Sequence, residues 1–141
     1  MVVWNALKLG LKNSYKMLIK ICKIIIPVYF VISLLDYTGI LSYVSNWFSG
    51  IMKIFGLPGE CALVLLLANC INIYAGIAAI GVTVLNVKQL TILGTMICLS
   101  HSLFMETSII KGLSFPRYLQ LIIRLGLSII EGINMNVVWV C

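Results

Sequence analysis

Long apolar runs, separated by short polar segments, constrain this chain more than any other feature. They occupy residues 24–44, 61–85, 90–110 and 118–140. A helix needs about 20 apolar residues to cross a bilayer core about 30 Å thick. Hydrophobic residues make up 62% of the chain and charged residues 10%, against about 45–50% and about 25% in soluble domains. The sequence therefore predicts an all-α integral membrane protein with one domain.

The basic residues gather near the N-terminus. Half of the ten lysines and arginines lie there, at Lys8, Lys12, Lys16, Lys20 and Lys23. Because lysines four residues apart stay on one helix face, residues 1–23 are expected to form an amphipathic interfacial helix. The basic part of this segment is too long for the short basic region of a cleavable signal peptide. An excess of lysine marks the cytoplasmic side and attracts acidic lipid, so we expect a multi-pass cell-membrane protein with a cytoplasmic N-terminus, and no nucleic-acid partner.

Two further elements precede the run at 61–85. The first span is expected at 21–36, where Pro27 is tolerated in a first turn or makes a kink. Residues 39–56 carry apolar side chains at helical spacing with serine, asparagine and lysine between them, which predicts a second amphipathic helix. The sequence GLPGE at 56–60 then ends that helix, because glycine and proline break helices.

The run at 61–85, CALVLLLANCINIYAGIAAIGVTVL, has a polar centre at Asn69 and Asn72. It is either one long span or two half-length helices that form a re-entrant hairpin. If it re-enters, Lys111 and Arg117 join the N-terminal lysines on the cytoplasmic side, and only Lys53 and Lys88 lie outside. That arrangement fits the positive-inside rule better, by about one residue, so we favour a re-entrant hairpin with about three full spans.

The last two runs are expected to be spans at 90–110 and 118–140. The first carries His101 and Glu106, whose separation of five residues places them about 140° apart on an unbroken helix. The second carries Arg124 and Glu131, seven residues apart and too distant for an i,i+4 pair. An ionisable side chain at the bilayer centre costs about 2.5–3.5 kcal/mol, so such residues usually face a bundle interior or a wet cavity.

The polar residues of these runs are the candidate binding residues. If the hairpin tip and His101 reach a similar depth, their side chains converge on a site for a small polar solute or an ion. Asparagine and serine also join helices, at about 0.6 kcal/mol per hydrogen bond, and Glu106 can instead cap a helix or pair with Lys111. The candidate set comprises Asn69, Asn72, Ser100, His101, Ser102 and Glu106.

The sequence offers little for other chemistry. With one histidine and no P-loop, dinucleotide fingerprint or H-E-x-x-H, we expect no enzyme and no cofactor. One histidine and scattered cysteines do not have metal-ligand spacing, so no metal site is expected. The five cysteines, an odd number placed mostly in apolar runs, are expected to be buried thiols and not a disulfide framework.

Three motifs resemble the Gate, or nucleoside-recognition, domain. They are GLPGE before an apolar segment, YAGIA after its polar centre, and HSLFMET in the next segment, followed by KGLSFPR and a basic final helix. The resemblance covers roughly residues 20–130 and implies that 24–141 forms a single Gate-type membrane domain. Gate domains occur in concentrative nucleoside transporters, in ferrous iron transporter B and in spore maturation proteins A and B.

The resemblance implies a transporter-like architecture with re-entrant hairpins around a mid-membrane site. It does not establish a nucleoside ligand, and the absence of a GTPase domain here argues against a stand-alone iron transporter. Secondary transporters build their site between two repeats, so a single Gate unit should need a second copy or a second Gate-domain protein. We therefore expect a transport or channel-like subunit working as an oligomer, or alternatively a non-transporting scaffold or regulatory subunit that acts through a partner.

Overall fold

A computed structural model describes residues 2–109 and 116–139, and these residues form helices joined by turns and short loops. The order is α1 (Val2–Tyr37), α2 (Ile40–Ile54), α3 (Cys61–Cys70), α4 (Ile73–Ile80), α5 (Val87–Ser100), α6 (Leu103–Ile109) and α7 (Arg117–Val138). Three stretches of the described chain are long and apolar enough to cross a membrane: Val3–Tyr37, Val87–Thr107 and Arg117–Val138. The expected all-α class is confirmed, and these three stretches could be the three expected spans.

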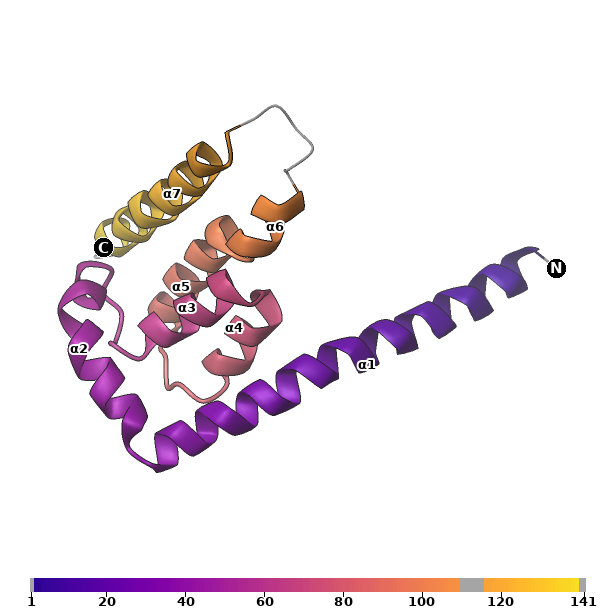
Figure 1. Cartoon of the computed structure of the whole chain (residues 1–141), viewed down its shortest axis with the longest axis horizontal. Coiled ribbons are helices and arrows are strands. Elements are labelled where there is room, and N and C mark those ends of the chain that lie inside the picture. The colour runs from indigo at the N-terminus through magenta and orange to yellow at the C-terminus, as the bar shows by residue number, and fades with distance from the viewer. Residues whose placement is uncertain (1, 110–115, 140–141) are drawn as a thin grey trace.

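The first helix joins two expected elements into one. The basic segment 1–23 and the span at 21–36 form a single 36-residue helix that continues through Pro27. Proline lacks the N–H that would bond to the carbonyl of Lys23, so the ladder loses one hydrogen bond there. Figure 1 shows the N-terminal half of α1 projecting away from the other helices, while its C-terminal half lies beside α4.

Glycines make the two turns around α2. Gly39 has a φ of 76° and Gly56 a φ of 69°, in the left-handed region that glycine enters without strain. They bound the amphipathic helix expected over 39–56. The loop after Gly56 then packs closely, since a Cβ built at Gly59 would lie 2.0 Å from the backbone oxygen of Ser45.

The run at 61–85 is divided into two short helices. The chain turns at Ile71–Asn72, and α4 packs back against α3 so closely that a Cβ on Gly76 would lie 2.6 Å from the Cβ of Ala68. A helical hairpin is therefore present (Figure 1). Its return to the same side of the bilayer stays a prediction.

The span expected at 90–110 is not one continuous helix. It is interrupted at His101–Ser102, between α5 and α6. The reason lies in the hydrogen bonds at the break. The backbone N–H of Ser102 donates to the carbonyl of Ala68 in α3, and not to the α5 carbonyl four residues before it. The α5 carbonyls at the break are met instead by side chains from Ser100, His101 and Arg124.

The core is built mainly from α3 and α5, with residues of α1, α2 and α4, and α7 packs against α5. Ile92 and Leu93 of α5 and Cys61 of α3 are fully buried. Gly132 lets α7 approach α5, because a Cβ there would lie 2.7 Å from the sulfur of Met96. A second link ties α7 to α2, where the Asn136 amide donates to the carbonyl of Ile54 over 3.1 Å. The core thus holds the hairpin, the broken helix and the last span together.

The start of α5 gives a first stability prediction. Asn86 and Gln89 form a capping box in which each side chain accepts from the other residue's backbone N–H. Asn86→Ala is expected to lower the free energy of unfolding by about 1 kcal/mol, because one backbone donor loses its partner. Asn86→Ser should stay close to the wild type, since serine also accepts at this position. Denaturant unfolding in mixed micelles measures both, and equal losses in the two variants would contradict the capping role.

Candidate functional site

The two interruptions of the helices meet. The backbone N–H of Ser102, in the break between α5 and α6, donates to the carbonyl of Ala68 in α3 over 2.9 Å. Ala68 precedes Asn69 and lies four residues before the hairpin turn at Asn72. One backbone hydrogen bond therefore joins the segment that carries the asparagines to the segment that carries His101.

Asn72 and Asn69 have different surroundings. Asn72 caps α4, and its Oδ1 accepts the backbone N–H of Ala75 over 3.0 Å. The Oδ1 atom of Asn69 is buried and has no hydrogen-bond partner among the described residues. A buried polar atom left unpaired costs about 1–3 kcal/mol, so Asn69 presents an acceptor that a ligand, a water or a partner chain would stabilise.

Ser100 and Ser102 are both buried at the break. The Ser100 hydroxyl donates to the carbonyl of Met96 over 2.8 Å, and Ser128 of α7 donates to the same oxygen over 3.0 Å. Ser102 has a φ of 55°, in the left-handed region that non-glycine residues seldom adopt. Such strain persists only where the surroundings impose it and is common at binding sites. Ser100 thus packs at the contact between α5 and α7, and Ser102 is the residue at which the backbone bends.

His101 is held at the end of α5. Its Nδ1 lies 3.2 Å from the carbonyl oxygens of Ile97 and of Cys98, so this nitrogen carries the hydrogen in the observed arrangement. Its Nε2 lies 3.8 Å from the nearer carboxylate oxygen of Glu106. An unbroken helix would place these two residues on different faces; the break turns α6 and brings them together.

Arg124 of α7 completes this cluster. Its guanidinium pairs with the carboxylate of Glu106, and its Nε donates to the carbonyl of Leu99 over 2.9 Å. The sequence spacing suggested only Glu131 as a neighbour of Arg124, and the pair with Glu106 was not foreseen. A lone cation in one apolar span and a lone carboxylate in the preceding span are the signal that could have found it. The alternative pairing of Glu106 with Lys111 falls outside the described residues.

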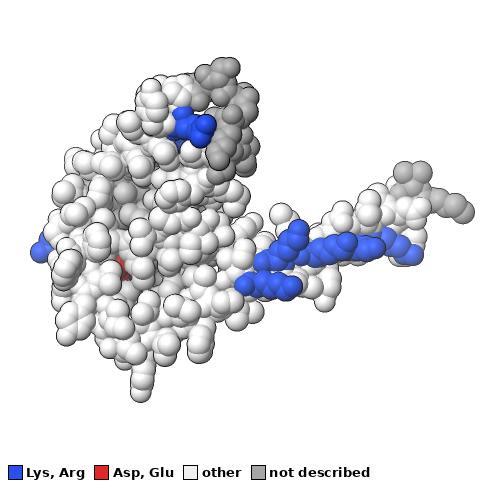
Figure 2. All heavy atoms as spheres, in the orientation of Figure 1, with Lys and Arg blue, Asp and Glu red and all other residues white. Residues whose placement is uncertain are grey.

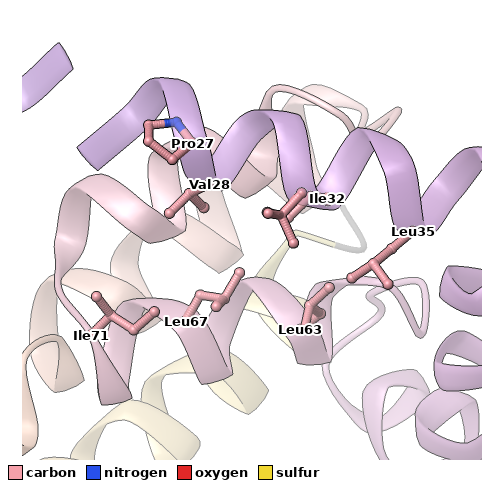
Figure 3. Close-up of a pocket in the computed structure, with 8 residues that line it drawn as sticks. Pro27, Val28, Ile32, Leu35, Leu63, Leu67 and Ile71 are labelled. Atoms are coloured by element: carbon pink, nitrogen blue, oxygen red, sulfur yellow. The ribbon is translucent and has the colours of Figure 1, made fainter. Parts of the chain in front are cut away.

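The two asparagines and His101 are brought to neighbouring segments but do not bind one another directly. Within the described chain no hydrogen bond joins the side chains of Asn69, Asn72 and His101. Grooves elsewhere in the described part of the chain include two between helices. One of about 240 Å³ separates α1 from α3 (Figure 3), and one of about 400 Å³ between α5 and α7 is lined by Thr95, Cys98, Leu99, Leu127, Ile130 and Glu131. Among the described residues, no three His, Cys, Asp or Glu side chains gather as metal ligands would.

This arrangement defines a class of protein: a multi-pass helical membrane protein in which two interrupted helices pack at their breaks. The sequence comparisons make the assignment specific. The profile of the Gate family, described as nucleoside recognition, matches residues 18–123, and the chain belongs to this family. The resemblance found in the motifs is confirmed.

Two relatives are themselves without a described activity. The uncharacterized membrane protein YvoD of Bacillus subtilis (strain 168) is 32% identical over 130 residues, which is 92% of this chain and 42% of that protein. The uncharacterized protein MJ0880 of Methanocaldococcus jannaschii is 32% identical over 124 residues, which is 85% of this chain and 39% of that protein. The chain thus spans about two fifths of the relatives it matches. No solved structure matches it significantly.

Proposed function

We propose that this Gate-family protein is a subunit of a membrane transporter or channel, and that it binds a small polar solute or an ion where its two interrupted helices meet. The observation that carries the proposal is the Ser102–Ala68 backbone hydrogen bond, with the unpaired Oδ1 of Asn69 one residue away. Irregular backbone at membrane depth is tolerated only where protein or a water-filled cavity covers it. Transporters use such half-helix junctions as mid-membrane binding sites.

The roles of the side chains follow from their contacts. Asn69 would accept a hydrogen bond from the solute, or supply an oxygen to a cation. The Oδ1 of Asn72 already caps α4, so its free amide N–H₂ would be the group that donates. His101 would offer Nε2 as a hydrogen-bonding group, and Glu106, 3.8 Å from that nitrogen, would assist it. Ser100 and Ser102 would shape the break, and no enzymatic step is assigned to any of them.

The proposed topology keeps the N-terminus in the cytoplasm. The chain would cross with α1, enter and leave the membrane on the outer side with the hairpin of α3 and α4, and cross back with α5 and α6. Arg117 then joins the N-terminal lysines inside, while Lys53 and Lys88 lie outside. This places the excess of basic residues on the cytoplasmic side.

An oligomer is part of the proposal. The grooves between α1 and α3 and between α5 and α7 do not include Asn69, Asn72 or His101, so this chain needs another surface to enclose a site there. The two relatives each have more than half of their length outside the matched segment, which is room for another unit of this size. A second copy or a second Gate protein would supply that surface here.

Asn69→Ala tests the binding role. We expect it to abolish uptake in proteoliposomes, measured in turn with uridine, Na⁺ and Fe²⁺, while the thermal stability stays equal or rises, because an unpaired buried amide is removed. Asn72→Ala and His101→Ala should also reduce uptake. Thr95→Ala, in the separate groove between α5 and α7, serves as the control. Wild-type uptake in all three site variants would dispose of the assigned residues.

One observation favours a scaffold or regulatory subunit as the second candidate. Glu106 and Arg124 neutralise each other within the chain, and Nδ1 of His101 is already bonded to backbone carbonyls. Such groups would then only join helices or hold a partner. A stoichiometric co-purifying protein, together with no uptake of the three probes by the pair, would favour this candidate.

A further inference from the structure

The first helix is longer than a bilayer needs. Its 36 residues measure about 54 Å, against a hydrocarbon core about 30 Å thick. About 16 residues are therefore left over, and the segment that projects from the body in Figure 1 is the N-terminal one. From Val3 to Lys20 every side chain on it is exposed. We call residues 3–23 the arm; its inner end, with Lys20 and Lys23, overlaps the start of the roughly 20 residues that cross.

The arm has one basic face. Placed on a helical wheel, its five lysines fall within an arc of about 120°. Figure 2 shows them as a continuous blue stripe along the projecting segment, and the ammonium group of Lys8 lies 5.4 Å from the centre of the Trp4 ring. Apolar side chains fill most of the remaining arc, and those of Trp4, Leu7, Leu11, Met17 and Leu18 are all exposed. This is the pattern of a helix that lies at the boundary between headgroups and acyl chains.

The inner end of the arm leads to an apolar groove. Pro27, Val28, Val31, Ile32 and Leu35 of α1 form one wall, and Leu63, Leu67 and Ile71 of α3 form the other (Figure 3). The groove has a volume of about 240 Å³. Pro27 and Ile71 mark the end that lies nearer the arm. The groove is wholly apolar and runs along α1, which fits an extended hydrocarbon chain.

The last two lysines of the arm precede Pro27, the α1 residue at the end of this groove nearer the arm, and Lys23 also lines a second apolar groove with Leu18, Ile19, Cys22 and Ile26. Lys23 and Lys20 precede Pro27 by four and seven residues, which are one and two helical turns, so they lie on the same side of α1 as Pro27. Long lysine side chains reach from a helix within the membrane to the headgroup level. A lipid with a negative headgroup at that level would contact the two lysines, and its acyl chain would fill the apolar groove below them.

We propose that α1 binds an anionic phospholipid. Its acyl chain lies in the groove between α1 and α3, and its phosphate lies against Lys20 and Lys23. The outer lysines Lys8, Lys12 and Lys16 extend the same contact along the headgroup layer. This proposal does not depend on the transport function.

Competition between two lipids tests the proposal on the full chain. The protein is purified in detergent with equal amounts of phosphatidylglycerol and phosphatidylcholine, and the lipids retained are measured by native mass spectrometry. Wild-type protein should retain mainly phosphatidylglycerol. Lys20→Gln with Lys23→Gln should lower the ratio of the two lipids about 30-fold, because each lysine near the surface contributes about a fivefold preference. Lys20→Arg with Lys23→Arg should preserve the ratio, which separates lost charge from misfolding.

The matched control is Lys53→Gln on α2, an exposed lysine far from the groove in sequence. Its lipid ratio should equal that of the wild type. A ratio unchanged in the glutamine pair, or equally lowered by Lys53→Gln, would overturn the proposal. So would a disulfide formed between Val31→Cys in one copy and Leu67→Cys in another, because a second chain would then occupy the groove.

Discussion

Arg124→Leu is expected to lower the free energy of unfolding by about 3 kcal/mol, one of the two largest single-residue effects in this chain. The guanidinium pairs with Glu106 and also bonds to the carbonyl of Leu99, so its removal leaves the carboxylate without its arginine and the helix-end carbonyl without this donor. Removing one member of a buried ion pair costs about 3–5 kcal/mol. The side chains of Arg124 and Glu106 are 19% and 35% exposed, which places the expected loss at the low end.

A double variant distinguishes the loss of the ion pair from the loss of packing contacts made by the Arg124 side chain. Arg124→Leu combined with Glu106→Leu should recover most of the stability, since apolar replacement of both partners is often neutral. Arg117→Leu, at the exposed start of the same helix, should change the free energy of unfolding by less than about 0.5 kcal/mol. Unfolding in mixed micelles measures all three. If the double variant is as unstable as Arg124→Leu, the ion pair is not the cause.

Gly76→Ala is expected to destabilise the protein by about 2 kcal/mol through the hairpin. The added methyl group would lie 2.6 Å from the Cβ of Ala68, so α3 and α4 must move apart, and overpacking costs about 1–3 kcal/mol. Because the carbonyl of Ala68 accepts from Ser102, that movement also weakens the link between the two breaks. We therefore expect solute or ion uptake to fall together with stability.

Two further variants test whether the collision with Ala68 causes this loss of stability. Gly94→Ala, on α5, has nothing within 4 Å of the added atom and should stabilise the protein by about 1 kcal/mol through helix propensity. The same substitution is thus expected to have opposite signs at the two glycines. Ala68→Gly should rescue Gly76→Ala, because it removes the methyl group that collides. Equal effects at Gly76 and Gly94 would contradict the close packing of the hairpin.

The helices and their order followed largely from the sequence. Apolar runs bounded by glycine and proline gave α2 and α7 to within a few residues, because hydrophobic periodicity and helix breakers are local signals. For 61–85 a single span and a re-entrant hairpin were both open; the turn at Asn72 shows two helices, and the re-entry stays a prediction. The continuity of α1 through Pro27 was not foreseen, since a proline in a helix can end it, kink it or be accommodated.

The site was harder to predict, because its contacts are not local. The break at His101–Ser102 depends on a backbone hydrogen bond to Ala68, 34 positions earlier in the chain. Nothing in HSLFMET itself marks the bend, and a periodic reading puts His101 and Glu106 on different faces. The pairing of Glu106 with Arg124 likewise depends on how α7 packs against α5. Residue types predicted which side chains matter, and tertiary packing decided which of them meet.

The central claim is that the hairpin of α3 and α4 returns to the side from which it came, so that Asn69 and Asn72 lie inside the membrane. The most direct measurement is labelling of single cysteines by a membrane-impermeant thiol reagent, in a chain whose own five cysteines are replaced. Lys53→Cys lies before the hairpin and Val84→Cys after it, and both positions are exposed. The account predicts that both react from outside the cell, while Lys12→Cys reacts only from the cytoplasmic side. Reaction of Lys53→Cys and Val84→Cys from opposite sides would contradict it.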